Sequence, residues 1–194
     1  MATTADLTEA IQKEIALLPR SFPYALSVAT AADDADILAL AEKHTTSVAG
    51  ACAWQPVIDA REAGVVKLRT GRVTVVSREK GIVRGMITYV PSDGVCCLQA
   101  IASDESLPLN EQLRSVYAIG LPMARALLSL GYKELVTRAF PVDDRMAVFA
   151  GGLRDGLGMK RLEHRLDETG EITHWTLILD LAASLKLFEA MPWR

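Results

Sequence analysis

Three short runs rich in β-branched residues, followed by one long amphipathic stretch, constrain the fold of this chain more than any other feature. The runs cover residues 72–77, 81–90 and 94–102, and turns at residues 78–81 and 91–94 separate them. Turns this short can join only antiparallel neighbours, because parallel strands need a long crossover connection. The sequence therefore predicts an antiparallel three-stranded meander.

The stretch after the meander has the pattern of a helix with one buried face. Apolar or small residues recur there at the i, i+3, i+4, i+7 spacing, namely Leu113, Val116, Tyr117, Gly120, Leu121, Ala124, Leu127 and Leu128. Asn110 is the expected N-cap, with Glu111 in the first turn, and Gly131 is the expected stop. Pro122 lies inside the pattern, which predicts a kink or a break near Gly120.

Composition favours a single domain that is neither disordered nor fibrous. Half of the 194 residues are hydrophobic, 23% are charged and the net charge is -3. Lysines and arginines are scattered rather than gathered in a basic stripe, so nucleic-acid binding is not expected. No apolar run approaches the roughly 18 residues of a membrane span. We therefore expect an intracellular protein without a membrane association.

Cysteine and histidine positions do not predict a metal site. The cysteines Cys52, Cys96 and Cys97 are odd in number and lack the spacing of metal ligands. Adjacent residues of a regular strand point to opposite faces, so Cys96 and Cys97 cannot hold one metal together. The three histidines lie far apart along the chain. Reduced thiols in the core are the expected state of the cysteines.

The two ends of the chain are expected to flank a central domain of residues 23–180. Residues 1–22 contain an amphipathic helix with Leu7 and Ile11 on its apolar side, a cap at Thr4 or Thr8, and a stop at Pro19. This helix either contacts a partner or packs on its own domain. Residues 181–194 form a short helix or an arm whose apolar side chains suggest self-association.

The remaining segments complete an alternating pattern of strands and helices. We expect a strand at residues 24–28, helices at 35–43, 56–63 and 145–154, a strand at 134–140, and a hairpin formed by 159–166 and 172–179. Because a long helix separates residues 134–140 from the meander, that strand can lie parallel to the third meander strand.

This order of elements resembles the GCN5-related N-acetyltransferase (GNAT) superfamily over residues 24–179. The likeness is carried by residues 28–41, by 73–89, and by Leu157-Gly158-Met159, which stands where the family has Leu-Gly-Phe. It implies an α/β (α+β) fold: a mixed central sheet with an antiparallel meander and a splayed parallel strand pair, flanked by helices. It also implies that an acyl-coenzyme A (acyl-CoA) lies between the splayed strands, at residues 95–102 and 134–140.

The family's loop for the acyl-CoA pyrophosphate is altered in this chain. That loop is Gln/Arg-x-x-Gly-x-Gly/Ala, and its backbone N–H groups hold the anion at the start of the long helix. Residues 103–111 contain no glycine, and Asp104, Glu105 and Glu111 place negative charge there. A carboxylate from this loop is an alternative occupant of the helix end. Arg154 stands near the position where many relatives have a tyrosine acid.

The resemblance also implies which residues would form a site. The donor would contact Ile101, Ala102, Ser103, Asn110, Gln112 and Arg154. A backbone amide near Ala102 would polarise the acyl carbonyl. Asp104 or Glu105 could act as a base toward an amine, and the alternative is that both are solvated loop acids.

Two functions follow from these observations. The first is a GNAT-fold protein with a degenerate pyrophosphate loop and no cofactor, which acts as a binding or structural component with a protein partner or a second copy. It would be cytoplasmic, or part of a virion if phage-encoded, because degenerate versions of this fold are similar to some internal virion proteins of tailed phages.

The alternative is an active N-acyltransferase that moves an acetyl group from acetyl-CoA to an amine of a small molecule or protein. Free backbone N–H groups in residues 104–111 would indicate the enzyme, and N–H groups bonded to the chain's own carboxylates would indicate the scaffold.

Overall fold

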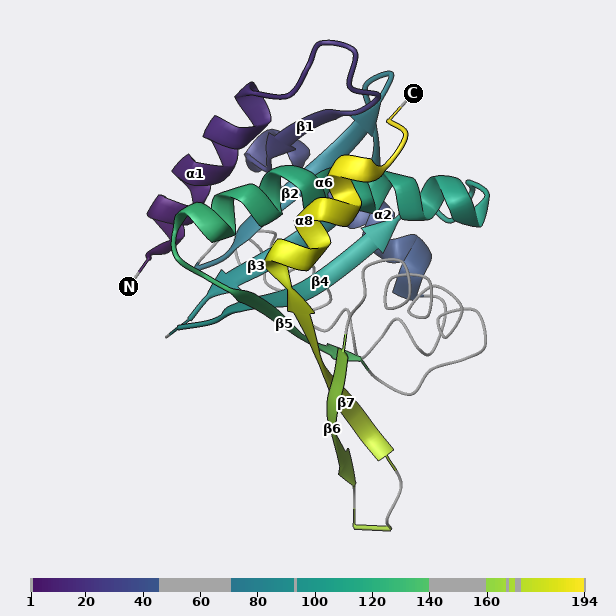
Figure 1. Cartoon of the computed structure of the whole chain (residues 1–194). Coiled ribbons are helices and arrows are strands. Elements are labelled where there is room, and N and C mark those ends of the chain that lie inside the picture. The colour runs from purple at the N-terminus through teal and green to yellow at the C-terminus, as the bar shows by residue number, and fades with distance from the viewer. Residues whose placement is uncertain are drawn as a thin grey trace.

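A computed structural model describes residues 2–45, 71–92, 94–139, 160–166, 168–169 and 172–193 (Figure 1). Its strands are β1 (Ala25–Val28), β2 (Val73–Glu79), β3 (Ile82–Pro91), β4 (Cys96–Ser103), β5 (Glu134–Ala139), β6 (Lys160–Leu166) and β7 (Ile172–Asp180). Its helices are α1 (Thr4–Ala16), the 3-10 turn η1 (Ala31–Asp33), α2 (Asp34–Thr45), α6 (Leu109–Ser129) and α8 (Leu181–Ala190). The predicted helices at 56–63 and 145–154, with Arg154, Cys52 and Leu157-Gly158, lie outside the described residues.

The strands form one mixed sheet in the order β1-β2-β3-β4-β5-β7-β6. Strands β1 to β4 are antiparallel, β5 is parallel to β4, and β7 and β6 add an antiparallel hairpin. This topology confirms the predicted meander, the parallel strand after the long helix and the final hairpin. It is the mixed α+β architecture that the sequence predicted.

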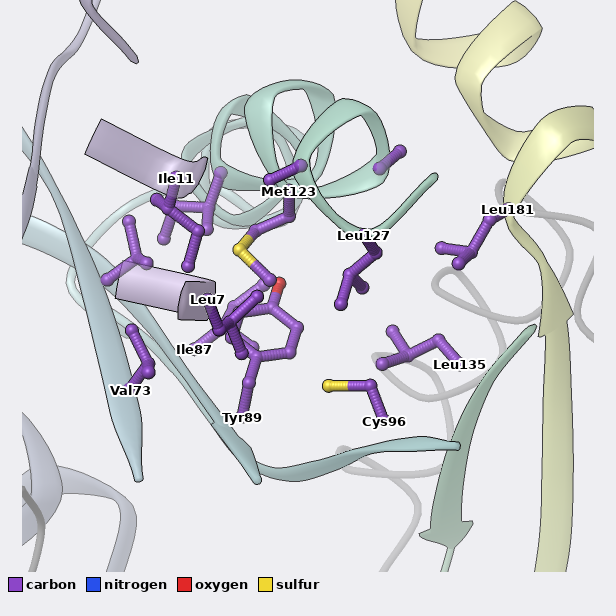
Figure 2. Packing of buried hydrophobic residues seen from close by; sticks show 14 of the residues in the cluster. Leu7, Ile11, Val73, Ile87, Tyr89, Cys96, Met123, Leu127, Leu135 and Leu181 are labelled. Atoms are coloured by element: carbon purple, nitrogen blue, oxygen red, sulfur yellow. The ribbon is translucent and has the colours of Figure 1, made fainter. Parts of the chain in front are cut away.

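Each face of the sheet carries its own hydrophobic core. Side chains alternate along β2, so Val73 and Val75 join the larger core under α1, α6 and α8, while Val76 joins a smaller core beside α2. In β3, Tyr89 lies in the larger core and Met86 in the smaller one. Figure 2 shows the larger core, where residues of α1 and α6 meet those of β2, β3, β4 and β5.

Helix α1 packs on its own domain, as one of the two alternatives predicted. Leu7 and Ile11 are fully buried in the larger core. The cap is Thr3 and not Thr4 or Thr8, because Thr3 and Asp6 form a capping box in which each side chain accepts the other's backbone N–H. The helix ends at Ala16, ahead of Pro19.

Helix α6 starts earlier than predicted and continues past its internal proline. Its N-cap is Pro108 and not Asn110, which lies in the first turn instead. Proline suits this position because its φ is already close to that of a helix and no N–H is needed there. Of the predicted kink or break near Gly120, the break is absent: α6 runs continuously through Pro122, since its long buried face outweighs one lost hydrogen bond.

The end of α6 matches its prediction. Gly131 has a φ of 86°, a left-handed conformation that glycine adopts without strain. The N–H of Gly131 donates to Leu128 O and that of Tyr132 to Leu127 O, both at 3.0 Å. These two bonds form a Schellman motif, which satisfies the last carbonyls and turns the chain into β5.

The C-terminal segment is a helix that packs across α6. The Asp180 side chain caps α8 by accepting the Ala183 N–H at 2.9 Å. The Phe188 ring rests directly on Gly120 of α6, where a Cβ atom would come within 2.3 Å of the ring. Beyond α8, the Trp193 ring lies 5.1 Å from that of Phe22, between centroids. Among the described residues, no helix combines the length and apolar character needed to cross a membrane.

Candidate functional site

Strands β4 and β5 pair over a short distance and then part. Their parallel register runs from Cys96 opposite Leu135 to Leu98 opposite Thr137. Strand β4 continues to Ser103 beside β3, while β5 continues to Ala139 beside β7. The sheet therefore opens between the carboxyl ends of β4 and β5, as the resemblance predicted for a splayed pair.

A bulge in β4 lies at the point where the strands part. Leu98 pairs with Tyr89 and Ala100 with Thr88, so Gln99 has no opposite residue in β3. Such an extra residue disrupts the ladder locally and re-aims the side chains around it. The Gln99 Oε1 atom is buried and accepts no hydrogen bond within the part of the chain that the structure describes.

The loop between β4 and α6 is organised around the carboxylate of Asp104. One oxygen, Oδ1, accepts the Ser106 N–H at 3.1 Å and the Ser106 hydroxyl at 2.6 Å. The other oxygen, Oδ2, accepts from Arg84 Nη1 at 2.6 Å. Asp104 is only 3% exposed, so this carboxylate is buried and held by three donors.

The backbone of the same loop is bonded as well. The Asp104 N–H donates to Arg84 O at 2.8 Å, and the Leu107 N–H donates to Asp104 O at 3.0 Å. The first of these bonds continues the β3–β4 ladder by one rung beyond Gly85 opposite Ser103. Arg84 is also the extra residue of a bulge toward β2, where Ser77 pairs with Gly85 and Arg78 with Val83. Arg84 thus holds Asp104 through both its carbonyl and its guanidinium.

Two buried side chains complete the junction between β4 and α6. The Ser103 hydroxyl donates to Gln112 Oε1 at 3.1 Å, and Gln112 Nε2 donates to Leu107 O at 2.7 Å. Both residues are buried, and these bonds occupy both ends of the Gln112 amide. Their polar groups therefore hold the loop in place and point at the chain itself.

The other residues predicted for the site are spread around this junction. Ile101 is partly buried and packs against both cores, and Ala102 is buried in the smaller core. Glu105 is partly exposed, and Asn110 lies on the exposed side of the first turn of α6. The structure thus brings Ser103, Asp104 and Gln112 together and leaves Asn110 apart.

Sequence reasoning missed Arg84 and Ser106. Arg84 is a charged residue inside an otherwise apolar strand, beside Gly85, and that contrast was the available signal. Gly85 is also where α6 approaches β3, because a Cβ atom there would lie 2.8 Å from Ser115 Oγ. Ser115 Oγ in turn donates to Arg84 O at 3.1 Å.

Tyr24, just before β1, is a further titratable group influenced by charges of this region. Burial raises the pKa of its phenol above the ordinary value. Arg114 and Arg84 lower that pKa, whereas Glu79 and Glu111 raise it. The phenol is therefore neutral at neutral pH. Among the described residues, no group of three or more His, Cys, Asp or Glu side chains is placed to hold a metal ion.

Comparison with known proteins identifies the fold. No protein-family model and no curated protein matches the sequence. Among solved structures, aminoglycoside 6'-acetyltransferase type Ii is similar with a TM-score of 0.61 and 12% identity, over 80% of this chain and 96% of that one. A putative GNAT-family acetyltransferase from Desulfovibrio desulfuricans has a TM-score of 0.59 and 14% identity, over 81% and 99%. The chain has the GNAT fold.

The likeness extends to GNAT proteins that act on quite different substrates. The ribosomal-protein-S18-alanine N-acetyltransferase from Escherichia coli matches with a TM-score of 0.53 and 10% identity, over 81% of this chain and 94% of that one. At such low identities the shared property is the GNAT fold alone.

Several backbone N–H groups of the loop between β4 and α6 are bonded within the chain. The resemblance predicts that the pyrophosphate of an acyl-CoA would be held by backbone N–H groups at the start of α6. The N–H groups of Asp104, Ser106 and Leu107 are already bonded within the chain, and a buried carboxylate lies among them. A pyrophosphate would meet a like charge where it needs donors.

Proposed function

We propose that this GNAT-fold protein is a binding or structural component whose pyrophosphate loop is degenerate. The observation that carries the proposal is the Asp104 carboxylate, which accepts the Ser106 N–H and pairs with Arg84 at the start of α6. The Ser106 N–H is bonded to the chain's own carboxylate, which supports the scaffold over the enzyme.

Displacing that carboxylate would be unfavourable. Asp104 would lose three hydrogen bonds, one of them to a guanidinium, and hydrogen bonds to charged groups contribute about 1.5–3 kcal/mol each. An entering pyrophosphate would have to supply that free energy in addition to its own desolvation. The arrangement therefore supports a protein that does not use acetyl-CoA.

The partner in this proposal is a protein, either a second copy of the chain or another chain. The protein would act in the cytoplasm, or in a virion if it is phage-encoded. Size-exclusion chromatography with light scattering distinguishes the first partner from the second, because a self-associating chain elutes at a multiple of its 21.0 kDa mass.

An N-acyltransferase is the second candidate, and the opening between β4 and β5 favours it. The strands part after Leu98, and the Gln99 Oε1 atom is buried there without a donor among the described residues. Under this reading the base is Asp104 or Glu105, and Asp104 is already paired with Arg84. The donor would be acetyl-CoA and the acceptor an amine.

A thermal titration with acetyl-CoA and free CoA separates the two functions. A ligand that binds only the folded state raises its stability, by about 2.7 kcal/mol at one hundred times Kd. For a chain of this size that corresponds to a rise in Tm of roughly 5–10 °C. We expect no rise up to several millimolar ligand, compared with sodium chloride at matched ionic strength. A clear rise at sub-millimolar ligand would contradict the proposal and support the acyltransferase.

A further inference from the structure

Asp104 is bound by its neighbours as a small anion would be. Its carboxylate receives a backbone N–H and a hydroxyl from Ser106 and a guanidinium N–H from Arg84. Backbone amides, hydroxyls and arginines are the groups with which proteins bind phosphate. The carboxylate comes from the loop itself, and the arginine comes from β3, 20 residues away.

The Arg84 guanidinium also approaches a second carboxylate, that of Glu79. Arg84 Nε is buried and makes no hydrogen bond with any described residue. It lies 3.7 Å from Glu79 Oε2, which is an ionic approach but too long for a hydrogen bond. A planar carboxylate offers two oxygens, whereas a tetrahedral oxyanion offers three or four. The donors of Ser106 and Arg84 Nη1 that hold the Asp104 carboxylate can therefore also bind a tetrahedral oxyanion.

We infer that Arg84 and Ser106 form an anion-binding site that the chain fills with its own Asp104 carboxylate, and that the site takes a tetrahedral oxyanion of the phosphate class once that carboxylate is removed. The inference rests on the proposed function, in which the wild-type loop is closed. It adds the identity of the donors and the class of anion they accept.

The natural chain is expected to exclude phosphate because Asp104 is tethered beside its donors. A tethered group competes at a high effective concentration, on the order of millimolar or above for short linkers. Its burial also leaves little room for a second anion of the same sign. Removal of the carboxylate frees the Ser106 donors and leaves the Arg84 charge without its closest partner.

The test is a thermal titration of Asp104→Ala with inorganic phosphate, with sodium chloride at matched ionic strength as the blank. We expect phosphate to raise the Tm of this variant by about 3 °C or more at 10 mM and to leave the wild type unchanged. The matched control is Glu105→Ala, which removes the same charge one residue away and should show no rise. Arg84→Met combined with Asp104→Ala should lose the rise.

Each outcome decides the inference. No rise for Asp104→Ala, or an equal rise in all variants, would overturn it. If Asp104→Ala folds poorly, phosphate should restore its folding. Asp104→Ser provides a second variant, because its hydroxyl can still accept the Ser106 N–H. Failure of both to respond to phosphate also overturns it. Binding of acetyl-CoA to the wild type would contradict the proposed function instead, so the two failures are distinguishable.

Discussion

At the scale of single residues, Arg84 holds a later loop of the chain through two of its groups. Its carbonyl extends the β3–β4 ladder by one rung and accepts the Asp104 N–H at 2.8 Å. Its guanidinium then reaches the Asp104 carboxylate. One residue thereby fixes both the backbone and the side chain of a loop that comes later in the sequence.

Loss of the Arg84 guanidinium should destabilise the fold more than loss of a surface arginine. Arg84→Met leaves the buried Asp104 carboxylate without its counter-charge, so we expect a loss of about 2–4 kcal/mol in the free energy of unfolding. The control is Arg125→Met, because the Arg125–Glu189 pair is 34% and 47% exposed and should contribute less than about 1 kcal/mol. Urea unfolding measures both, and equal losses would refute the comparison.

The thiol of Cys96 should be inert in the folded protein. Burial, and to a lesser extent the neighbouring Cys97, raises its pKa to about 12, so almost no thiolate exists at pH 8. We expect iodoacetamide to modify Cys96 at pH 8 only after unfolding in urea, as read by peptide mass spectrometry. Equal labelling of Cys96 with and without urea would show that the thiol is accessible.

The raised pKa of Cys96 also makes stability depend on pH. The contribution of the neutral thiol to the free energy of unfolding is complete below pH 9 and is lost as the pH rises toward 12.

At the scale of elements, the contact between α6 and α8 depends on the absence of a side chain at Gly120. A Cβ atom there would approach the Phe188 ring to 2.3 Å, much closer than carbon atoms normally come. The two helices can therefore lie close together only with glycine at this position. The position is a helical glycine retained for packing, although alanine has the higher helix propensity by about 1 kcal/mol.

Gly120→Ala should therefore destabilise the protein in spite of that propensity. Overpacking costs about 1–3 kcal/mol and the helix propensity of alanine offsets about 1 kcal/mol, so we expect a net loss of up to about 2 kcal/mol in the free energy of unfolding. In a Phe188→Ala background the same change should be neutral or stabilising, because the ring is gone. A double-mutant cycle by chemical denaturation measures this coupling. Additive effects would show that the ring does not determine the choice of glycine.

The elements were predicted from the sequence more completely than the site. Runs of alternating apolar residues, and one stretch in which apolar residues recur with the period of a helix, were sufficient to predict the meander, α6 and the final hairpin. These patterns could be read from the sequence because each of them is local. The Asn110 cap failed because Pro108 begins the helix earlier. Ser103, Asp104 and Gln112 were foreseen because they are close in sequence. The Arg84–Asp104 pair was not, because it depends on the register between β3 and β4, which the alternation within each strand does not reveal.

At the scale of the whole molecule, α1 is part of the fold's main core. Leu7 is 0% exposed and contributes to the same cluster as residues of β2, β3 and α6. A hydrophobic helix face of this kind links the first residues of the chain to the centre of the sheet (Figure 2). Stability of the domain should therefore depend on this N-terminal helix.

Leu7→Ala tests that dependence, with Leu17→Ala as its control. Truncation of a fully buried leucine costs about 2–5 kcal/mol through lost burial and the cavity it leaves. Leu17 is 65% exposed, so its truncation should change the free energy of unfolding by less than about 0.5 kcal/mol. Urea denaturation followed by circular dichroism gives both values. Similar small losses would mean that α1 is dispensable for the domain.

The bulge at Gln99 means that β4 is one residue longer than its packing requires. Cys96 and Leu98 face the larger core before the bulge, and Ser103 faces Gln112 of α6 after it. Deleting Gln99 would restore strict alternation and leave every one of these side chains on its present face. The extra residue therefore lies where the sheet opens, and the hydrophobic alternation of β4 does not require it.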